Sequence, residues 1–210
     1  LPIFAVMPAM ATEQLKVNSN LEMTEGILDG EFTAAAIRVE DEGVLTINGA
    51  VFVNNTIADT WYWGGVIYNK GQIASINSAF TNNKLVSKAE RGALGGAIAT
   101  ISGIGDVNAD FINNSIQSIN GAGAKGGAIY TYASGNIKSI SGNFIGNSVV
   151  AESQAIGGAI TNDGDIGTIV SERGFMNNFA KSDEKAYAGA LYNSEYATIE
   201  DIAANFVNNN

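Results

Sequence analysis

Hydrophobic and polar positions along this chain follow a repeating unit. Residues 126–147 read GGAIYTYASGNIKSISGNFIGN, in which three short β-type runs (128–130, 137–140 and 144–145) alternate with turn residues. No segment of ten or more residues shows the 3.6-residue periodicity of a helix. The pattern predicts an all-β unit of about three short strands followed by one longer loop.

The unit recurs six times at nearly constant spacing. A pair of small residues opens the copies at 34–35, 64–65, 95–96, 126–127, 157–158 and 188–189, in steps of 30, 31, 31, 31 and 31 residues. Each copy closes on a phenylalanine that is followed three residues later by an asparagine. The phenylalanines are Phe52, Phe80, Phe111, Phe144, Phe175 and Phe206, and the asparagines are Asn55, Asn83, Asn114, Asn147, Asn178 and Asn209. A fixed period of this length indicates a solenoid, a propeller or an array.

The repeat length favours one of these architectures. A propeller blade needs about four strands in 40–50 residues, which exceeds the unit found here. Three strands per repeat suit one turn of a parallel β-helix, whose turns stack at about 4.8 Å. We therefore predict a right-handed parallel β-helix (solenoid) of about six 31-residue rungs over residues 34–210.

Stacking gives each repeated residue type a structural role. The phenylalanines are expected to fill the core, and the asparagines to form an amide ladder that satisfies the turn backbone. The glycine pairs have no accompanying lysine or helix, as a phosphate-binding loop would require. They are expected at tight corners, with unusual φ angles or close backbone packing. The intact pairs are Gly95, Gly96, Gly126, Gly127, Gly157 and Gly158.

Composition limits the chemistry. The chain has 11 Lys and Arg against 21 Asp and Glu, so its net charge of -10 disfavours nucleic-acid binding. It contains no cysteine and no histidine, which removes thiolate nucleophiles, imidazole bases and the usual zinc ligands. We predict no cofactor, no metal and no catalytic residue.

Both ends of the sequence carry expectations about processing. Residues 1–11, LPIFAVMPAMA, are apolar and end in a small-x-small pattern, which predicts the remnant of a secretory signal peptide. The alternative is an N-terminal strand or cap. Residues 12–33 are more acidic and less regular, and are expected to form a cap. Because residues 206–210 repeat the closing motif, we expect the natural protein to continue.

Carboxylate pairs are the candidates for chemistry, because a glycosidase needs two carboxylates at a set separation. The pairs are Asp106 with Asp110, Asp163 with Asp165, and Asp183 with Glu184. A lyase would also need a basic residue beside such acids, and none of the arginines, Arg38, Arg91 and Arg173, lies in a column that matches an acid cluster. The 163–165 segment offers too few oxygens for a Ca²⁺ site, so a solvated turn is the preferred interpretation.

Residues 84–94, 116–125, 149–156 and 180–187 differ in sequence from copy to copy, so we expect partners to be contacted there. Trp61, Tyr62 and Trp63 lie in the corresponding segment of an earlier copy. Exposed aromatic rings can bind sugars or proteins, which makes these residues a possible partner-contact loop. Leu94, Ile156 and Tyr187 occupy equivalent positions, so the preferred interpretation is that the rings cover the flank of the rod.

The paired motifs resemble those of bacterial autotransporter passengers, especially the chlamydial polymorphic outer-membrane protein type. In that family Gly-Gly-Ala-(Ile/Leu/Val) is paired with Phe-x-x-Asn, and here the resemblance covers about residues 34–210. It implies a right-handed β-helical passenger, export through a signal peptide, and delivery by a C-terminal barrel that this sequence does not contain. The role it implies is adhesion.

Three hypotheses follow. The first is a non-catalytic, adhesin-like or structural passenger at the bacterial cell surface or outer membrane, or secreted, which contacts a host-cell surface protein or glycan. The second is a secreted carbohydrate-active or carbohydrate-binding β-helix. The third is a rod that self-associates through exposed end strands.

Overall fold

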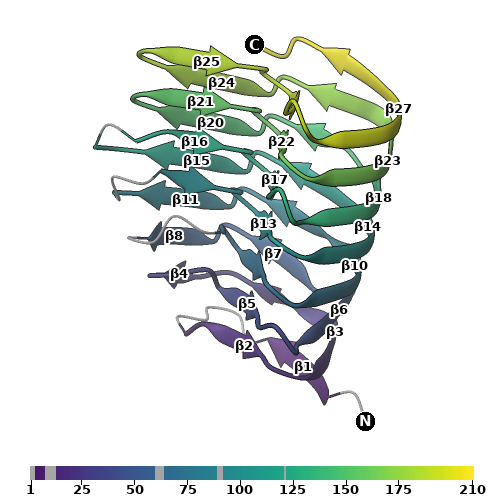
Figure 1. Ribbon diagram of the computed structural model, residues 1–210. Coiled ribbons are helices and arrows are strands. Elements are labelled where there is room, and N and C mark those ends of the chain that lie inside the picture. The colour runs from purple at the N-terminus through teal and green to yellow at the C-terminus, as the bar shows by residue number, and fades with distance from the viewer. Residues whose placement is uncertain (1–2, 8–12, 60–63, 89–91, 121) are drawn as a thin grey trace.

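The computed structural model describes residues 3–7, 13–59, 64–88, 92–120 and 122–210, and these residues contain strands and no helix. All strand pairings are parallel, and the strands form four sheets along one stack of coils (Figure 1). The chain is therefore a parallel β-helix, as the repeat predicts.

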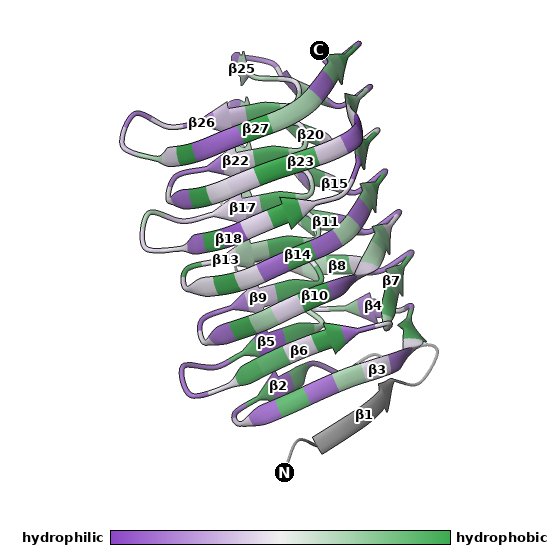
Figure 2. Cartoon of the chain, turned by 90° about the vertical axis from the view of Figure 1, so that its right-hand side faces the viewer, coloured by the Kyte–Doolittle hydropathy of each residue, from purple (hydrophilic) through white to green (hydrophobic). Residues whose placement is uncertain are grey.

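The largest sheet, called the long sheet here, has ten strands: β1 Ile3–Met7, β3 Asn20–Leu28, β6 Val44–Asn48, β7 Val51–Val53, β10 Gln72–Thr81, β14 Gly103–Ile112, β18 Asn136–Ser141, β19 Phe144–Ile145, β23 Asp165–Met176 and β27 Thr198–Val207. The seven-stranded sheet contains β2 Leu15–Val17, β5 Ile37–Val39, β9 Ile67–Asn69, β13 Ile98–Thr100, β17 Ile129–Thr131, β22 Ile160–Asn162 and β26 Leu191–Asn193. Figure 2 faces the long sheet and shows its strands one above another.

The remaining two sheets are smaller. The six-stranded sheet contains β4 Glu31–Phe32, β8 Thr56–Asp59, β11 Lys84–Ser87, β15 Ser115–Ser118, β20 Ser148–Ala151 and β24 Phe179–Ser182. The four-stranded sheet contains β12 Ala93–Leu94, β16 Ala124–Lys125, β21 Gln154–Ile156 and β25 Lys185–Tyr187.

The six copies of the repeat lie on consecutive coils in register. In the seven-stranded sheet each copy places the same residue of its opening motif opposite the equivalent residue of its neighbours. These residues are Ile37, Ile67, Ile98, Ile129, Ile160 and Leu191. The 31-residue period is thus the length of one coil.

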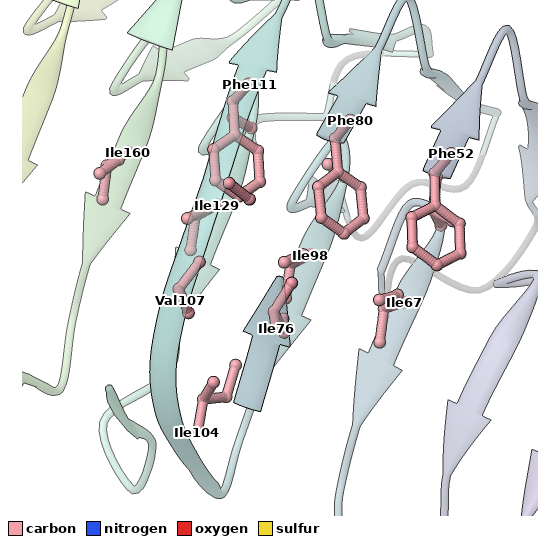
Figure 3. Close-up of a cluster of buried hydrophobic side chains, with 14 of the residues drawn as sticks. Phe52, Ile67, Ile76, Phe80, Ile98, Ile104, Val107, Phe111, Ile129 and Ile160 are labelled. Atoms are coloured by element: carbon pink, nitrogen blue, oxygen red, sulfur yellow. The ribbon is translucent and has the colours of Figure 1, made fainter. Parts of the chain in front are cut away.

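The phenylalanine column forms the centre of the core. Phe52, Phe80, Phe111, Phe144 and Phe175 have no exposed surface, and successive ring centroids lie 4.7–5.1 Å apart. Figure 3 shows the first three rings on neighbouring strands, beside the isoleucines of the seven-stranded sheet. Each ring therefore fills the layer of its own coil and packs on the rings of the adjacent coils.

The expectation of one long loop per repeat is wrong. Each of the segments 84–94, 116–125, 149–156 and 180–187 contains a strand of the six-stranded sheet and a strand of the four-stranded sheet. The two sheets face each other and project to the left in Figure 1. We call this projection, with the residues that connect its two sheets, the arm.

Small and aliphatic residues explain why the arm is regular. Leu85, Ile116 and Val149 alternate with outward-facing side chains, and they are buried opposite Ala124 and Ala155. This alternation is the period-2 pattern of a half-buried strand. The facing sheet contributes small side chains to this interior, namely the buried Ala93, Ala124 and Ala155.

A second apolar cluster lies on the outer face of the seven-stranded sheet. Ala35, Tyr68, Ala99 and Tyr130 are buried there, and Leu94 at the base of the arm packs against them. The middle strands β9, β13, β17 and β22 of the seven-stranded sheet are consequently buried on both faces, since every residue in them is buried.

Residues near the N-terminus continue the sheets. Strand β1 pairs in parallel with β3 of the long sheet, and β2, β3 and β4 each pair with the next coil. Whether residues 1–11 are the remnant of a signal peptide, and residues 12–33 a cap, stays a prediction.

Candidate functional site

The asparagine ladder runs beside the phenylalanine core. Nδ2 of Asn83 donates to Oδ1 of Asn114 at 2.8 Å, and Nδ2 of Asn114 donates to Oδ1 of Asn147 at 3.1 Å. Nδ2 of Asn114 also donates to the carbonyl of Phe80 at 2.9 Å, and the backbone N–H of Asn83 donates to Oδ1 of Asn114. Because these amides are fully buried and bridge adjacent coils, they hold the stack together.

The residue before each ladder asparagine adopts a left-handed conformation. Asn54, Asn82, Asn113 and Asn177 have φ angles of 53–57°, and Gly146 takes this position with φ 65°. Glycine adopts this conformation without a steric penalty, and asparagine tolerates it better than most other residues. The closing motif is therefore Phe-x-(Asn/Gly)-Asn, and its third position could have been identified from the sequence.

The two glycines of each opening pair have different roles. The first has a positive φ, for example 70° at Gly126. The second has no room for a side chain, because a Cβ on Gly127 would lie 2.0 Å from the carbonyl oxygen of Gly158. The pairs therefore mark a left-handed corner followed by the close approach of two coils.

We expect Gly127→Ala to destabilise the protein by about 3 kcal/mol, at the upper end of overpacking effects, because the obstructing atom belongs to the backbone of the next coil. Thermal unfolding monitored by circular dichroism would measure the loss. Gly123→Ala is the matched control, since its Cβ would lie no closer than 3.1 Å to another atom. Equal unfolding temperatures for the two variants would contradict the packing assignment.

The structure places the candidate carboxylates in separate local contacts. Oδ2 of Asp106 accepts from Lys138 at 2.9 Å and Oδ1 accepts from Ser139 at 2.7 Å. These hydrogen bonds, first that of Ser139 and then that of Lys138, lower the pKa of Asp106. Oδ1 of Asp110 accepts from the side chain and backbone of Asn143. Each carboxylate thus ties two adjacent coils of the long sheet.

Asp163 and Asp165 also lie in different environments. Oδ2 of Asp163 accepts from Nζ of Lys125 at 2.8 Å and from the hydroxyl of Tyr130 at 2.9 Å. Oδ1 of Asp165 accepts from the hydroxyl of Thr198 on the next coil. Asp163 therefore links the base of the arm to the seven-stranded sheet, a role that sequence reasoning missed because Lys125 and Asp163 are distant in the chain.

The contact of Tyr130 with Asp163 makes the stability of the protein depend on pH. Burial, then the charge and hydrogen bond of Asp163, raise the pKa of the Tyr130 hydroxyl well above its ordinary value. The folded protein consequently retains this proton to higher pH than the unfolded chain does. The stability that this provides is complete below about pH 10, the ordinary tyrosine pKa, and is lost as the pH rises further.

We therefore expect the unfolding temperature of the wild type to fall more steeply above about pH 10 than that of Tyr130→Phe. The measurement is a series of thermal melts at increasing pH. Tyr196→Phe is the control, since Tyr196 is 88% exposed, and it should follow the wild type. A Tyr130→Phe curve parallel to that of the wild type would show that this hydroxyl does not contribute.

A depression lies at the tip of the arm and crosses three coils. It has a volume of about 250 Å³ and is lined by Gln117, Ser118, Ile119, Val150, Ala151, Glu152, Lys181, Ser182 and Asp183. These residues end β15, β20 and β24 and begin the connections to the four-stranded sheet. All of them fall in the segments that vary between copies.

The connections between the two sheets of the arm differ in length among the three coils that line the depression. Residues 119–123 join β15 to β16, whereas residues 152–153 join β20 to β21 and residues 183–184 join β24 to β25. The connection after β15 is therefore three residues longer than the connections after β20 and β24.

Trp61, Tyr62 and Trp63 lie outside the described residues. The equivalent positions of later coils are described: Leu94 packs on the cluster around Tyr68, Ile156 is buried, and Tyr187 is 43% exposed. These three residues lie at the base of the arm, where the four-stranded sheet ends.

No family model matches the chain, and no curated protein or solved structure matches it. Within the described ranges, no three Asp or Glu side chains come together in a way that could hold a metal ion. None of the described residues belongs to a helix capable of crossing a membrane.

Proposed function

We propose that this protein is an adhesin-like or structural passenger that is exported to the bacterial surface or secreted and presents the arm on a stiff β-helical rod. The observation that carries the proposal is the alignment of the variable segments. Four segments of different sequence stack in register on one flank, whereas the core columns of phenylalanine and asparagine are nearly uniform. A uniform scaffold with one variable flank suits recognition, because the scaffold fixes where the variable side chains lie.

The proposed mechanism is the summation of weak contacts. Successive coils place equivalent arm residues about 4.8 Å apart, so a ligand longer than one coil contacts several of them at once. Many rods on one surface add avidity. The resemblance to autotransporter passengers supports surface delivery and adhesion, and the partner proposed is a protein or glycan on a host cell.

Binding of protein-coated beads to cultured epithelial cells tests the proposal. In the arm variant, residues 119–123 are replaced by the Glu-Ser connection of residues 152–153. The control changes Asn48, Asn77 and Asn108 to serine on the long sheet, where Ser141 already occupies the same column. We expect bead retention to fall at least tenfold for the arm variant and to be unchanged for the control.

Two further results complete this test. Retention should rise steeply with the density of protein on the bead, as avidity requires. Failure of wild-type beads to bind, or equal loss for both variants, would contradict the proposal. Sedimentation at several concentrations separates self-association from cell binding, because a rod that self-associates forms larger species as its concentration rises.

A further inference from the structure

We propose that the depression at the tip of the arm binds a single neutral or amino sugar residue of a glycan. This inference rests on the proposed recognition function and names the chemical class of its partner. Four observations carry it: an unpartnered buried hydroxyl, the mixture of donors and acceptors, the size of the depression, and its charge.

The first observation concerns Ser118. Its side chain is 3% exposed, and its hydroxyl has no hydrogen-bond partner among the described residues. The serines at the equivalent positions of other coils are satisfied: Oγ of Ser87 donates to the carbonyl of Gly92, and Oγ of Ser182 to that of Ser153. A buried polar group without a partner is costly, so a ligand hydroxyl that reaches Ser118 would gain from pairing with it.

The residue stacked on Ser118 explains why its hydroxyl has no partner on the next coil. Ser118 pairs with Ala151 on the next coil, and Ala151 pairs with Ser182. Ala151 thus stands between two serines in this column and has no hydroxyl with which Ser118 could pair. All three residues line the depression.

The second observation is the mixture of polar groups. Lys181 is a donor, Glu152 and Asp183 carry acceptor oxygens, and the amide of Gln117 provides both. Sugar hydroxyls donate and accept at once, so they suit such a mixture better than a group that can only accept. Val150 and Ile119 add an apolar surface for the C–H face of a sugar ring.

The size and charge of the depression limit the class of ligand that it can bind. About 250 Å³ lies below the roughly 300–1,000 Å³ of sites that enclose a whole small molecule, so one residue of a longer chain fits better. One lysine against two carboxylates leaves a net negative charge, which repels sialylated and phosphorylated sugars. Neutral sugars and amino sugars remain.

The backbone of the tip is already ordered. The N–H of Asp183 donates to the carbonyl of Glu152, and Oγ of Ser182 accepts from the N–H groups of Glu184 and Lys185. A preorganised wall loses little conformational entropy when a ligand binds.

The test uses a printed array of neutral, amino and sialylated glycans, probed with the full chain displayed on beads. We expect signal from neutral or amino glycans and none that depends on sialic acid. Val150→Trp fills the depression and should reduce the signal at least tenfold. Val86→Trp is the matched control, since Val86 lies in the same outward column two coils away, and it should retain the signal.

Ser118→Ala separates a binding role from a structural one. If the hydroxyl serves the ligand, this variant should lose threefold or more in signal while its unfolding temperature stays equal to that of the wild type or rises. Full signal from Val150→Trp, or signal restricted to sialylated glycans, would overturn the inference. If wild-type beads bind cells but no glycan on the array, the sugar assignment fails and the proposed function stands; if they bind neither, both fail.

Discussion

Replacing Phe144 by alanine is expected to lower the free energy of unfolding by about 3–5 kcal/mol. The Phe144 ring is fully buried and stacks on Phe111 at 5.0 Å and on Phe175 at 4.7 Å, with interplanar angles of 3° and 4°. Truncation would leave a cavity in one coil and would remove the contacts that couple it to both neighbours. Urea-induced unfolding followed by circular dichroism measures the change.

Phe206→Ala is the matched control, because Phe206 occupies the same column and stacks on Phe175 alone. Its side chain is 50% exposed, so truncation removes less buried surface and should cost less than half as much. Equal losses for the two variants, or a loss below about 1 kcal/mol for Phe144→Ala, would show that the stacked rings are not the main core.

Replacing Asn114 by alanine is the second prediction with a large expected effect. The carbonyl of Phe80 and the backbone N–H of Asn83 would each lose a buried partner. At about 1–3 kcal/mol for each orphaned group, the variant should lose about 2–6 kcal/mol of stability. Unfolding in urea, under the same conditions as for Phe144→Ala, gives the measurement.

Asn113→Gly provides the comparison for the ladder. Asn113 is exposed, has φ 53°, and corresponds to Gly146 on the next coil. Its side chain donates one exposed hydrogen bond, to Asn82. Asn113→Gly should therefore change the free energy of unfolding by no more than about 0.5 kcal/mol. If Asn113→Gly costs as much as Asn114→Ala, the burial of the ladder is not what makes it stabilising.

Much of this fold could be predicted from the sequence because stacking repeats the same environment in every coil. Phe111 has phenylalanine above and below it, and Asn114 has asparagine on both sides. A residue type that is repeated at a fixed spacing therefore reports directly on the structure. The glycine pairs follow the same logic, since each copy places backbone against backbone at the same corner.

The arm could not be predicted in the same way. Its residues differ between copies, so no column of identical residues indicated that 116–125 forms strands. Its apolar residues, such as Ile116 and Ala124, occur singly or in short runs, and such runs are equally compatible with a loop. The depression is lined by residues 117–119, 150–152 and 181–183, which belong to three coils and come together only when the coils are stacked.

The in-register stacking of coils is the central claim, because it alone brings the variable segments together on one flank. The chain has no cysteine, so spin labels can be placed at Asn48→Cys and Ala203→Cys without competing sites. These exposed positions lie in one column of the long sheet, five coils apart. Five steps of about 4.8 Å predict about 24 Å between the labelled backbone sites, in a narrow distribution measured by double electron–electron resonance. A broad distribution, or a mean separation well above this value, would contradict the stacked fold and the recognition surface built on it.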